Sequence, residues 1–166
     1  MFTNLKIENF KAFSSEQEID FAPITLIFGQ NSSGKSSIIQ SILALKQTLL
    51  NPTNNASFIT SGSCIDLGGY LSAVNSHDAK KNIKLEISFV NNLSPQEYND
   101  EFLEYPIFST TDVRNVGFEY CYSNKEGMKD SFLRDFSYFV KTPGSRHKKN
   151  RIKYKERCDR VYKNFR

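Results

Sequence analysis

The chain contains no tryptophan and only three cysteines among its 166 residues. The cysteines stand far apart, so they fit neither a disulfide framework nor a metal cluster, and a reducing compartment such as the cytoplasm is expected. No apolar run approaches the roughly 18 residues of a membrane-spanning helix. No basic segment followed by an apolar one opens the sequence, as a secretory signal would. An integral membrane protein and a secreted protein are therefore not expected.

What the chain does contain is enough apolar material for a folded core. Hydrophobic residues make up 39% and charged residues 24% of the chain, which excludes wholesale disorder. Fourteen phenylalanines and eight tyrosines supply bulk for packing. The length suits one domain, or one domain and a piece of another.

The charge is distributed unevenly. Residues 1–140 hold 11 Lys and Arg against 16 Asp and Glu, a net charge of −5, whereas residues 141–166 hold 11 against two, a net charge of +9. We therefore divide the chain into a lobe over 1–140 and a basic extension over 141–166, for which a helix is predicted from residue 152 onward. The extension could attract a polyanion such as DNA or RNA, or it could be a solvated helix leading into an arm or a further lobe. Its candidate contacts to nucleic acid are Lys148, Lys149, Arg151 and Lys153.

Apolar periodicity predicts an α/β protein. Alternation predicts an antiparallel pair of strands at residues 5–10 and 18–21, and further strands at 82–89 and 116–122. Residues 132–140 fit either a strand or a helix. Ile24–Phe28 is apolar without alternation, which is typical of a strand covered on both faces in a parallel sheet. An amphipathic helix is predicted over residues 34–50.

A complete phosphate-binding loop joins that apolar strand to the helix. The pattern G-x-x-x-x-G-K-[ST] spans residues 29–36. Glycines let the backbone wrap closely around a polyanion, and successive N–H groups at the start of a helix converge on it. The residues predicted to bind the phosphates are Gly29, Gln30, Asn31, Ser32, Ser33, Gly34, Lys35, Ser36 and Ser37.

Two side chains in this loop have distinct expected roles. The ammonium of Lys35 would place a positive charge on the β- and γ-phosphates, and the hydroxyl of Ser36 would bind Mg²⁺. The alternative is a Gly/Ser-rich turn that caps a helix and binds no ligand. That alternative leaves Lys35 unexplained, because a cation in the first turn of a helix opposes the helix dipole unless an anion is present.

Two segments together carry a family resemblance. Residues 5–13 read LKIENFKAF, and residues 24–37 read ITLIFGQNSSGKSS. This combination resembles the opening of ABC-class ATPases of the SMC, RecF and OLD type, which are often described as AAA-family ATPases. The resemblance implies a P-loop NTPase fold: an ABC-type head lobe with an antiparallel β subdomain beside a parallel core strand and the phosphate-loop helix.

The resemblance also implies roles for residues and partners. Asn31 would lie near the γ-phosphate, Gln30 and residues 32–37 would line the phosphates, and Lys11 would lie near the nucleotide. ATP and Mg²⁺ are the implied ligands. A second ATPase head, and in some settings an effector nuclease subunit, are the implied partners. DNA transactions and anti-phage defence are the implied biological settings.

The sequence departs from this family in ways that matter for catalysis. It contains no apolar strand ending in Asp-Glu (the Walker B motif) and no Leu-Ser-Gly-Gly signature, so no catalytic residue can be identified. The chain thus resembles the N-terminal lobe of a larger head, expected to be an ATPase as part of that larger unit. Two alternatives remain open. One is a nucleic-acid-binding or assembly module with a structural phosphate loop. The other is a small P-loop kinase or GTPase, although no N-K-x-D guanine-reading motif is present.

Overall fold

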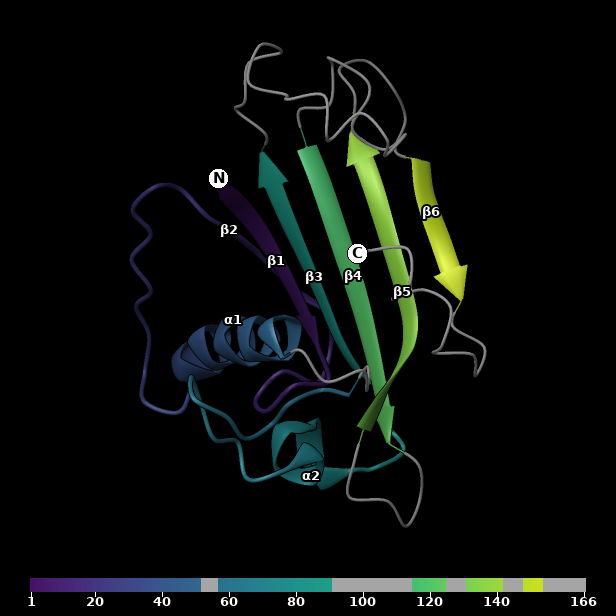
Figure 1. Ribbon diagram of the computed structural model, residues 1–166. Coiled ribbons are helices and arrows are strands. Elements are labelled where there is room, and N and C mark those ends of the chain that lie inside the picture. Colours follow the sequence, from purple (N-terminus) through teal and green to yellow (C-terminus); the bar gives the residue numbers. More distant parts are fainter. Residues whose placement is uncertain (52–56, 91–114, 125–130, 142–147, 154–166) are drawn as a thin grey trace.

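The computed structural model describes residues 1–51, 57–90, 115–124, 131–141 and 148–153 (Figure 1). The described strands form one six-stranded sheet in the order β2-β1-β3-β4-β5-β6, and every neighbouring pair is antiparallel. The elements are β1 (Phe2–Glu8), β2 (Gln17–Asp20), α1 (Lys35–Leu50), α2 (Tyr70–Ala73), the 3-10 turn η1 (Asn75–His77), β3 (Ile83–Val90), β4 (Asn115–Asn124), β5 (Ser131–Lys141) and β6 (Lys148–Lys153).

The predicted antiparallel pair at the N-terminus is present as β1 and β2, with Leu5 opposite Ile19. β3 lies on the other side of β1, with Leu85 opposite Ile7. The predicted strands at residues 82–89 and 116–122 correspond to β3 and β4. The ambiguous segment at 132–140 is a strand, β5, which pairs with β4 along its whole length.

The two faces of the sheet differ in character because side chains alternate between them. Leu5, Ile7 and Leu85 are fully buried on the inner face, where α1, α2 and residues 58–67 pack against β1, β3 and β4. Figure 1 shows α1 beside β1 and β2, with α2 near the end of the sheet where β3 begins. The core on this face comprises Leu5, Ile7, Phe10, Ile38, Ala44, Leu45, Phe58, Leu67, Tyr70, Ala73, Val74, Ile83, Leu85, Ile87 and Tyr122.

Helix α1 begins one residue after the predicted start and ends at the predicted residue, but its buried face differs from the apolar stripe in its sequence. Ser37, Ser41 and Ala44 face the core, whereas the side chains of Ile39 and Leu49 are 56% and 51% exposed. Small residues on the buried face let the helix approach the rest of the core closely. Ile39 and Leu49 are consequently left on its outer surface, whereas Ile38 and Leu45 remain in the core.

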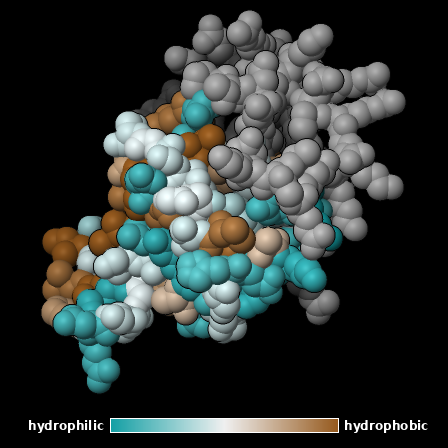
Figure 2. All heavy atoms as spheres, turned by 90° about the horizontal axis from the view of Figure 1, so that it is seen from below, coloured by the Kyte–Doolittle hydropathy of each residue, from teal (hydrophilic) through white to brown (hydrophobic). Residues whose placement is uncertain are grey.

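The parallel core strand predicted at Ile24–Phe28 is absent from the described structure. The segment is extended but belongs to no strand, and Ile24, Leu26 and Phe28 are 83%, 72% and 84% exposed. Only Ile27 packs against the core. Figure 2 shows apolar surface gathered on the side of the molecule where this segment and α1 lie in Figure 1. The prediction is wrong for the described residues because none of them places a strand beside this one.

The basic extension also differs from its prediction. Lys148–Lys153 forms β6, which pairs with β5 at the edge of the sheet, with Ile152 opposite Phe136. The helix predicted from residue 152 onward is therefore wrong for residues 152 and 153, because pairing with β5 satisfies the backbone there. The rest of that predicted helix lies outside the described residues. In the described part of the chain, no helix is long and apolar enough to cross a membrane.

Candidate phosphate-binding site

The predicted phosphate loop leads from the exposed segment at Ile24–Phe28 directly into α1. Gln30 and Ser33 close a turn through the Ser33 N–H, which donates to the Gln30 carbonyl oxygen at 3.3 Å. Ser32 and Gly34 take left-handed backbone conformations, with φ of 65° and 92°. The loop therefore reverses direction twice within five residues before the helix begins at Lys35.

Gly34, the second glycine of the loop, is required because the side chains of Phe13 and Ala12 pack against it. A Cβ atom at Gly34 would stand 2.8 Å from the ring of Phe13 and 3.4 Å from the Cβ of Ala12. Its φ of 92° is also unfavourable for any residue with a side chain. Gly34 thus lets the turn between β1 and β2 pack directly against the start of α1. This contact explains in physical terms why the NFKAF segment and the phosphate loop occur together.

The ammonium of Lys35 folds back onto the loop itself. Lys35 Nζ donates to the Gly29 carbonyl oxygen at 2.8 Å and to the Gln30 carbonyl oxygen. The first turn of α1 contains no acidic residue that would balance this cation. A positive charge is therefore held at the amino end of a helix, where the helix dipole disfavours it.

Several backbone donors of the loop and of the first turn of α1 lack a protein acceptor in the described part of the chain. Among the described residues, no protein acceptor is found for the amide N–H groups of Ser32, Gly34, Lys35 and Ser36. The first N–H groups of a helix have no partner within the helix, so they remain available to a ligand or to water. Together with the Lys35 ammonium, these donors can surround an anion.

The remaining predicted loop residues fall into two groups. Residues 29–33 and Ser36 are exposed, so the Ser36 hydroxyl is accessible from solvent. Ser37, in contrast, is 7% exposed and faces the interior. Its side chain is therefore turned away from the loop surface on which the other predicted residues lie.

Lys11 lies in the turn that packs against this loop. Its backbone is left-handed, with φ of 46°, and its N–H donates to the Ala73 carbonyl oxygen at 2.8 Å. Asn75 Nδ2 donates to the Lys11 carbonyl oxygen at 2.7 Å. The structure thus brings Lys11 close to the loop through Ala12 and Phe13. No local pattern in the sequence singles out Asn75, which lies 64 residues away from Lys11.

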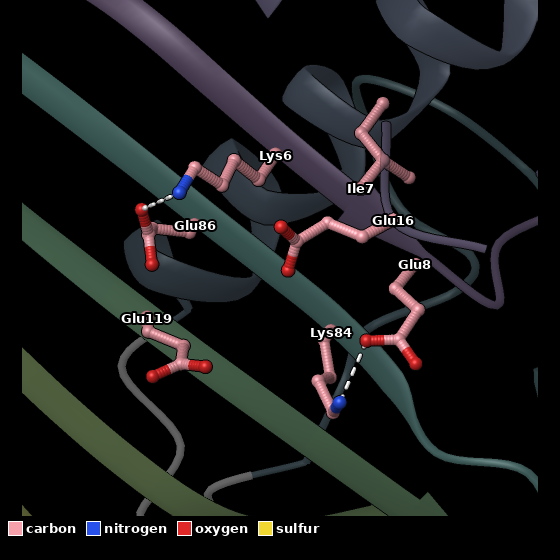
Figure 3. Close-up of a pocket in the computed structure, with 7 residues that line it drawn as sticks. All are labelled: Lys6, Ile7, Glu8, Glu16, Lys84, Glu86 and Glu119. Atoms are coloured by element: carbon pink, nitrogen blue, oxygen red, sulfur yellow. Dashed lines mark hydrogen bonds and ion pairs between the residues drawn. The ribbon is translucent and has the colours of Figure 1, made fainter. Parts of the chain in front are cut away.

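The outer face of the sheet carries a hollow that belongs to a separate site (Figure 3). Lys84 Nζ pairs with Glu8 Oε2 at 2.6 Å, and Lys6 Nζ pairs with Glu86 at 3.3 Å. The hydrogen bond from Lys84 to Glu8 raises the pKa of Lys84. Burial lowers the pKa of Lys6, but the neighbouring carboxylates outweigh it, so the net pKa shift is upward.

These ion pairs join adjacent strands, and both lysines stay protonated. The charged strand residues that line the hollow alternate with buried core residues such as Ile7 and Leu85, so these charged side chains lie on the face opposite α1 and the phosphate loop. Across the described ranges of the chain, no three His, Cys, Asp or Glu side chains are grouped so that they could hold a metal ion. The four basic residues predicted to contact nucleic acid all lie in β6, at the sheet edge opposite β2 (Figure 1).

The phosphate loop and the helix that follows it have the sequence pattern of a P-loop NTPase, whereas the described sheet is wholly antiparallel and does not by itself show that fold. The model of one protein family, described as an AAA domain, matches residues 4–163, and the chain belongs to this family. Membership indicates an ATP-binding, ATPase-like function. A comparison with proteins of curated function gives no match.

Proposed function

We propose that the chain binds Mg·ATP through residues 29–36 and Lys11, as the nucleotide-binding lobe of an ATPase of the SMC, RecF or OLD type. The observation that carries this proposal is the position of the Lys35 ammonium. It is held among the carbonyl oxygens of its own loop, beside amide N–H groups that have no acceptor among the described residues. A polyphosphate satisfies both the cation and the amides.

In this proposal each group has a defined task. The amides of the loop and of the first turn of α1 bind phosphate oxygens, and Lys35 moves from the carbonyls of its loop to the phosphates. The Ser36 hydroxyl would hold Mg²⁺ beside the phosphates. Mg²⁺ supplies charge neutralisation at the phosphates. Asn31, which is exposed in the loop, contacts the terminal phosphate in this proposal.

We further propose that this lobe works as part of a larger ATPase, with nucleotide binding driving the engagement of a second head. The exposed apolar segment at Ile24–Phe28 supports association with further β structure, because it is apolar on both faces and unpaired among the described residues. Hydrolysis then depends on acidic residues that the larger unit supplies. DNA-related work or anti-phage defence, with an effector nuclease as partner, is the setting that we propose for this activity.

A second candidate function rests on β6. This strand places Lys148, Lys149, Arg151 and Lys153 within six residues at a sheet edge. Closely spaced cations on an extended strand can contact successive phosphates of a nucleic acid. In this alternative the chain is a nucleic-acid-binding module, and its phosphate loop has only a structural role.

One variant tests the first proposal and separates it from the second. We expect Lys35→Ala to weaken Mg·ATP binding at least a hundredfold in calorimetry, because a direct charge-assisted contact to the phosphates is lost. Lys46→Ala is the matched control, because Lys46 is an exposed lysine of the same helix. Tight binding by Lys35→Ala would contradict the proposal. Salt-dependent DNA binding that survives in Lys35→Ala and needs no nucleotide would favour the second candidate.

A further inference from the structure

Unfavourable backbone conformations are concentrated at one junction of the molecule. Five residues other than glycine have positive φ in the described chain, and four of them meet where the β1–β2 turn contacts η1. Their φ values are 55° at Asn9, 46° at Lys11, 59° at Ser76 and 54° at His77, and the fifth residue is Ser32 in the phosphate loop. Such conformations persist only where the surrounding structure fixes them, and they are concentrated at functional sites.

Asn75 is the residue that fixes this junction. Its backbone N–H donates to the Asn9 carbonyl oxygen at 3.1 Å, and its Nδ2 donates to the Lys11 carbonyl oxygen at 2.7 Å. Its Oδ1 accepts from Ser76 Oγ at 2.9 Å and from Lys81 Nζ at 3.1 Å. One side chain therefore clamps the turn that carries Lys11.

Lys11 itself is an unfavourable choice for a purely structural turn. Glycine or asparagine adopts a φ of 46° at much lower cost than lysine does. The backbone N–H and carbonyl of Lys11 are both hydrogen-bonded, while its ammonium has no partner in the part of the chain that the structure describes. The structure thus fixes the backbone of Lys11 and leaves its charge free.

The same turn contacts the phosphate loop. The ring of Phe13 and the Cβ of Ala12 lie directly against Gly34, at the start of α1. Lys11 immediately precedes Ala12, so its backbone lies one residue away from the contact with Gly34.

From this geometry we propose that Asn75 is a positioning residue: it holds Lys11 in its left-handed conformation so that the Lys11 ammonium contacts the phosphates bound by residues 29–36. The inference rests on the proposed nucleotide-binding function and deepens it. It assigns a role to a residue far from the loop in sequence, which acts through Lys11 and does not itself contact nucleotide.

The test is a double-mutant cycle on the 166-residue chain, with Mg·ATP affinity measured by calorimetry and thermal unfolding measured without nucleotide. We expect Lys11→Gly to bind Mg·ATP roughly tenfold more weakly, because one charge-assisted contact is lost. Its melting temperature should stay the same or rise, since glycine accepts the positive φ. His77→Gly is the matched control: it relieves the same kind of backbone strain at a residue whose ring contacts the Leu71 carbonyl oxygen, and it should leave affinity unchanged.

Asn75→Ala should weaken binding roughly three- to tenfold in the wild-type background, and by less than twofold when Lys11 is already glycine. A merely structural role would instead give the same loss in both backgrounds. If Asn75→Ala does not fold, Asn75→Asp replaces it in the cycle, because aspartate keeps the acceptor for Ser76 and Lys81 and lacks the donor to Lys11.

Three results would overturn the inference alone: wild-type affinity in Lys11→Gly, wild-type affinity in the Asn75 variant, or additive losses in the double variant. In each of these cases Lys35→Ala would still abolish binding. Failure of the wild-type chain to bind Mg·ATP, or full binding by Lys35→Ala, would overturn the proposed function and this inference with it.

Discussion

The antiparallel sheet and the segment that enters the phosphate loop are both apolar in sequence, but their side chains differ greatly in burial. Leu85 in β3 is fully buried, because β1 and β4 pair with its strand and the core packs over it. Leu26 in the entering segment is 72% exposed, and no described residue forms a strand beside it. An apolar pattern thus indicates that a segment is stabilised by burial between neighbouring elements. It does not show whether the described residues provide those neighbours.

The largest expected effect tests this contrast with one substitution made in both regions. Leu85→Ala should lower the free energy of unfolding by roughly 3 kcal/mol, because it leaves a cavity in a fully buried site. Leu26→Ala should change it by less than about 0.5 kcal/mol, since the leucine side chain is already in water. Urea unfolding followed by circular dichroism measures both values.

The control is the slope of unfolding free energy against urea, which should be the same for both variants. A loss in Leu26→Ala comparable to that in Leu85→Ala would contradict the contrast. It would mean that Leu26 is buried in solution, by a second copy or by other residues of this chain.

The second expected effect concerns how firmly α2 is tied to the sheet. The Tyr70 hydroxyl lies 2.9 Å from the carbonyl oxygens of both Lys81 and Tyr122, and burial raises the pKa of Tyr70 to about 12. A raised pKa means that the folded protein holds the phenol proton more tightly than the unfolded chain does. The associated stability is therefore complete below pH 10 and is lost as the pH rises from about 10 to about 12, by up to roughly 2.7 kcal/mol.

Tyr70→Phe should remove this part of the pH dependence. At pH 8 the variant should be about 1 kcal/mol less stable, because the hydrogen bond is lost. Between pH 10 and 12 its free energy of unfolding should fall less steeply than that of the wild type in denaturant titrations at each pH. Parallel curves for the two proteins would show that the hydroxyl is hydrated in solution and that α2 is held less firmly than the sheet.

The smallest expected effect tests the contact between the β1–β2 turn and the phosphate loop. Gly34→Ala introduces a Cβ at positive φ against the Phe13 ring, whereas a Cβ at Gly69, also at positive φ, meets nothing within 4 Å. We expect both variants to lose stability from backbone strain, with Gly34→Ala losing about 1 kcal/mol more. Equal losses in thermal unfolding would mean that Phe13 moves away easily and that the turn is not packed against the loop.

Most of the sheet was predictable from local alternation, because antiparallel neighbours bury one face and expose the other. β1 and β3 follow that rule in their burial, whereas β4, although its apolar residues alternate in the sequence, buries runs of consecutive residues. β6 was missed because charge dominates its composition, while its strand structure comes from pairing with β5, which no single segment reveals. Ile24–Phe28 was predicted as a strand on a pattern that presupposes neighbours on both sides.

The phosphate loop was predictable because its chemistry is local: the glycines, the lysine and the hydroxyl lie within eight residues. The junction around Lys11 was not. Its clamp joins Asn75 to a turn 64 residues earlier in the chain, and the packing of Phe13 against Gly34 joins two further segments. Contacts between segments far apart in the sequence form only when the chain folds, so local sequence patterns do not predict them.

The bonds of Lys35 to its own loop have a consequence for the energetics of ligand binding. In the proposed function an incoming anion takes the place of the Gly29 and Gln30 carbonyl oxygens beside the Lys35 ammonium, so binding is an exchange of partners. The heat measured on titration is then the difference between the bonds formed and the bonds broken, smaller than a count of final contacts suggests. Removing the lysine removes both its contacts to the loop carbonyls and its contacts to the phosphates. The sign of the resulting change in binding enthalpy, measured together with the loss of affinity, therefore reports how strongly the loop binds the Lys35 ammonium.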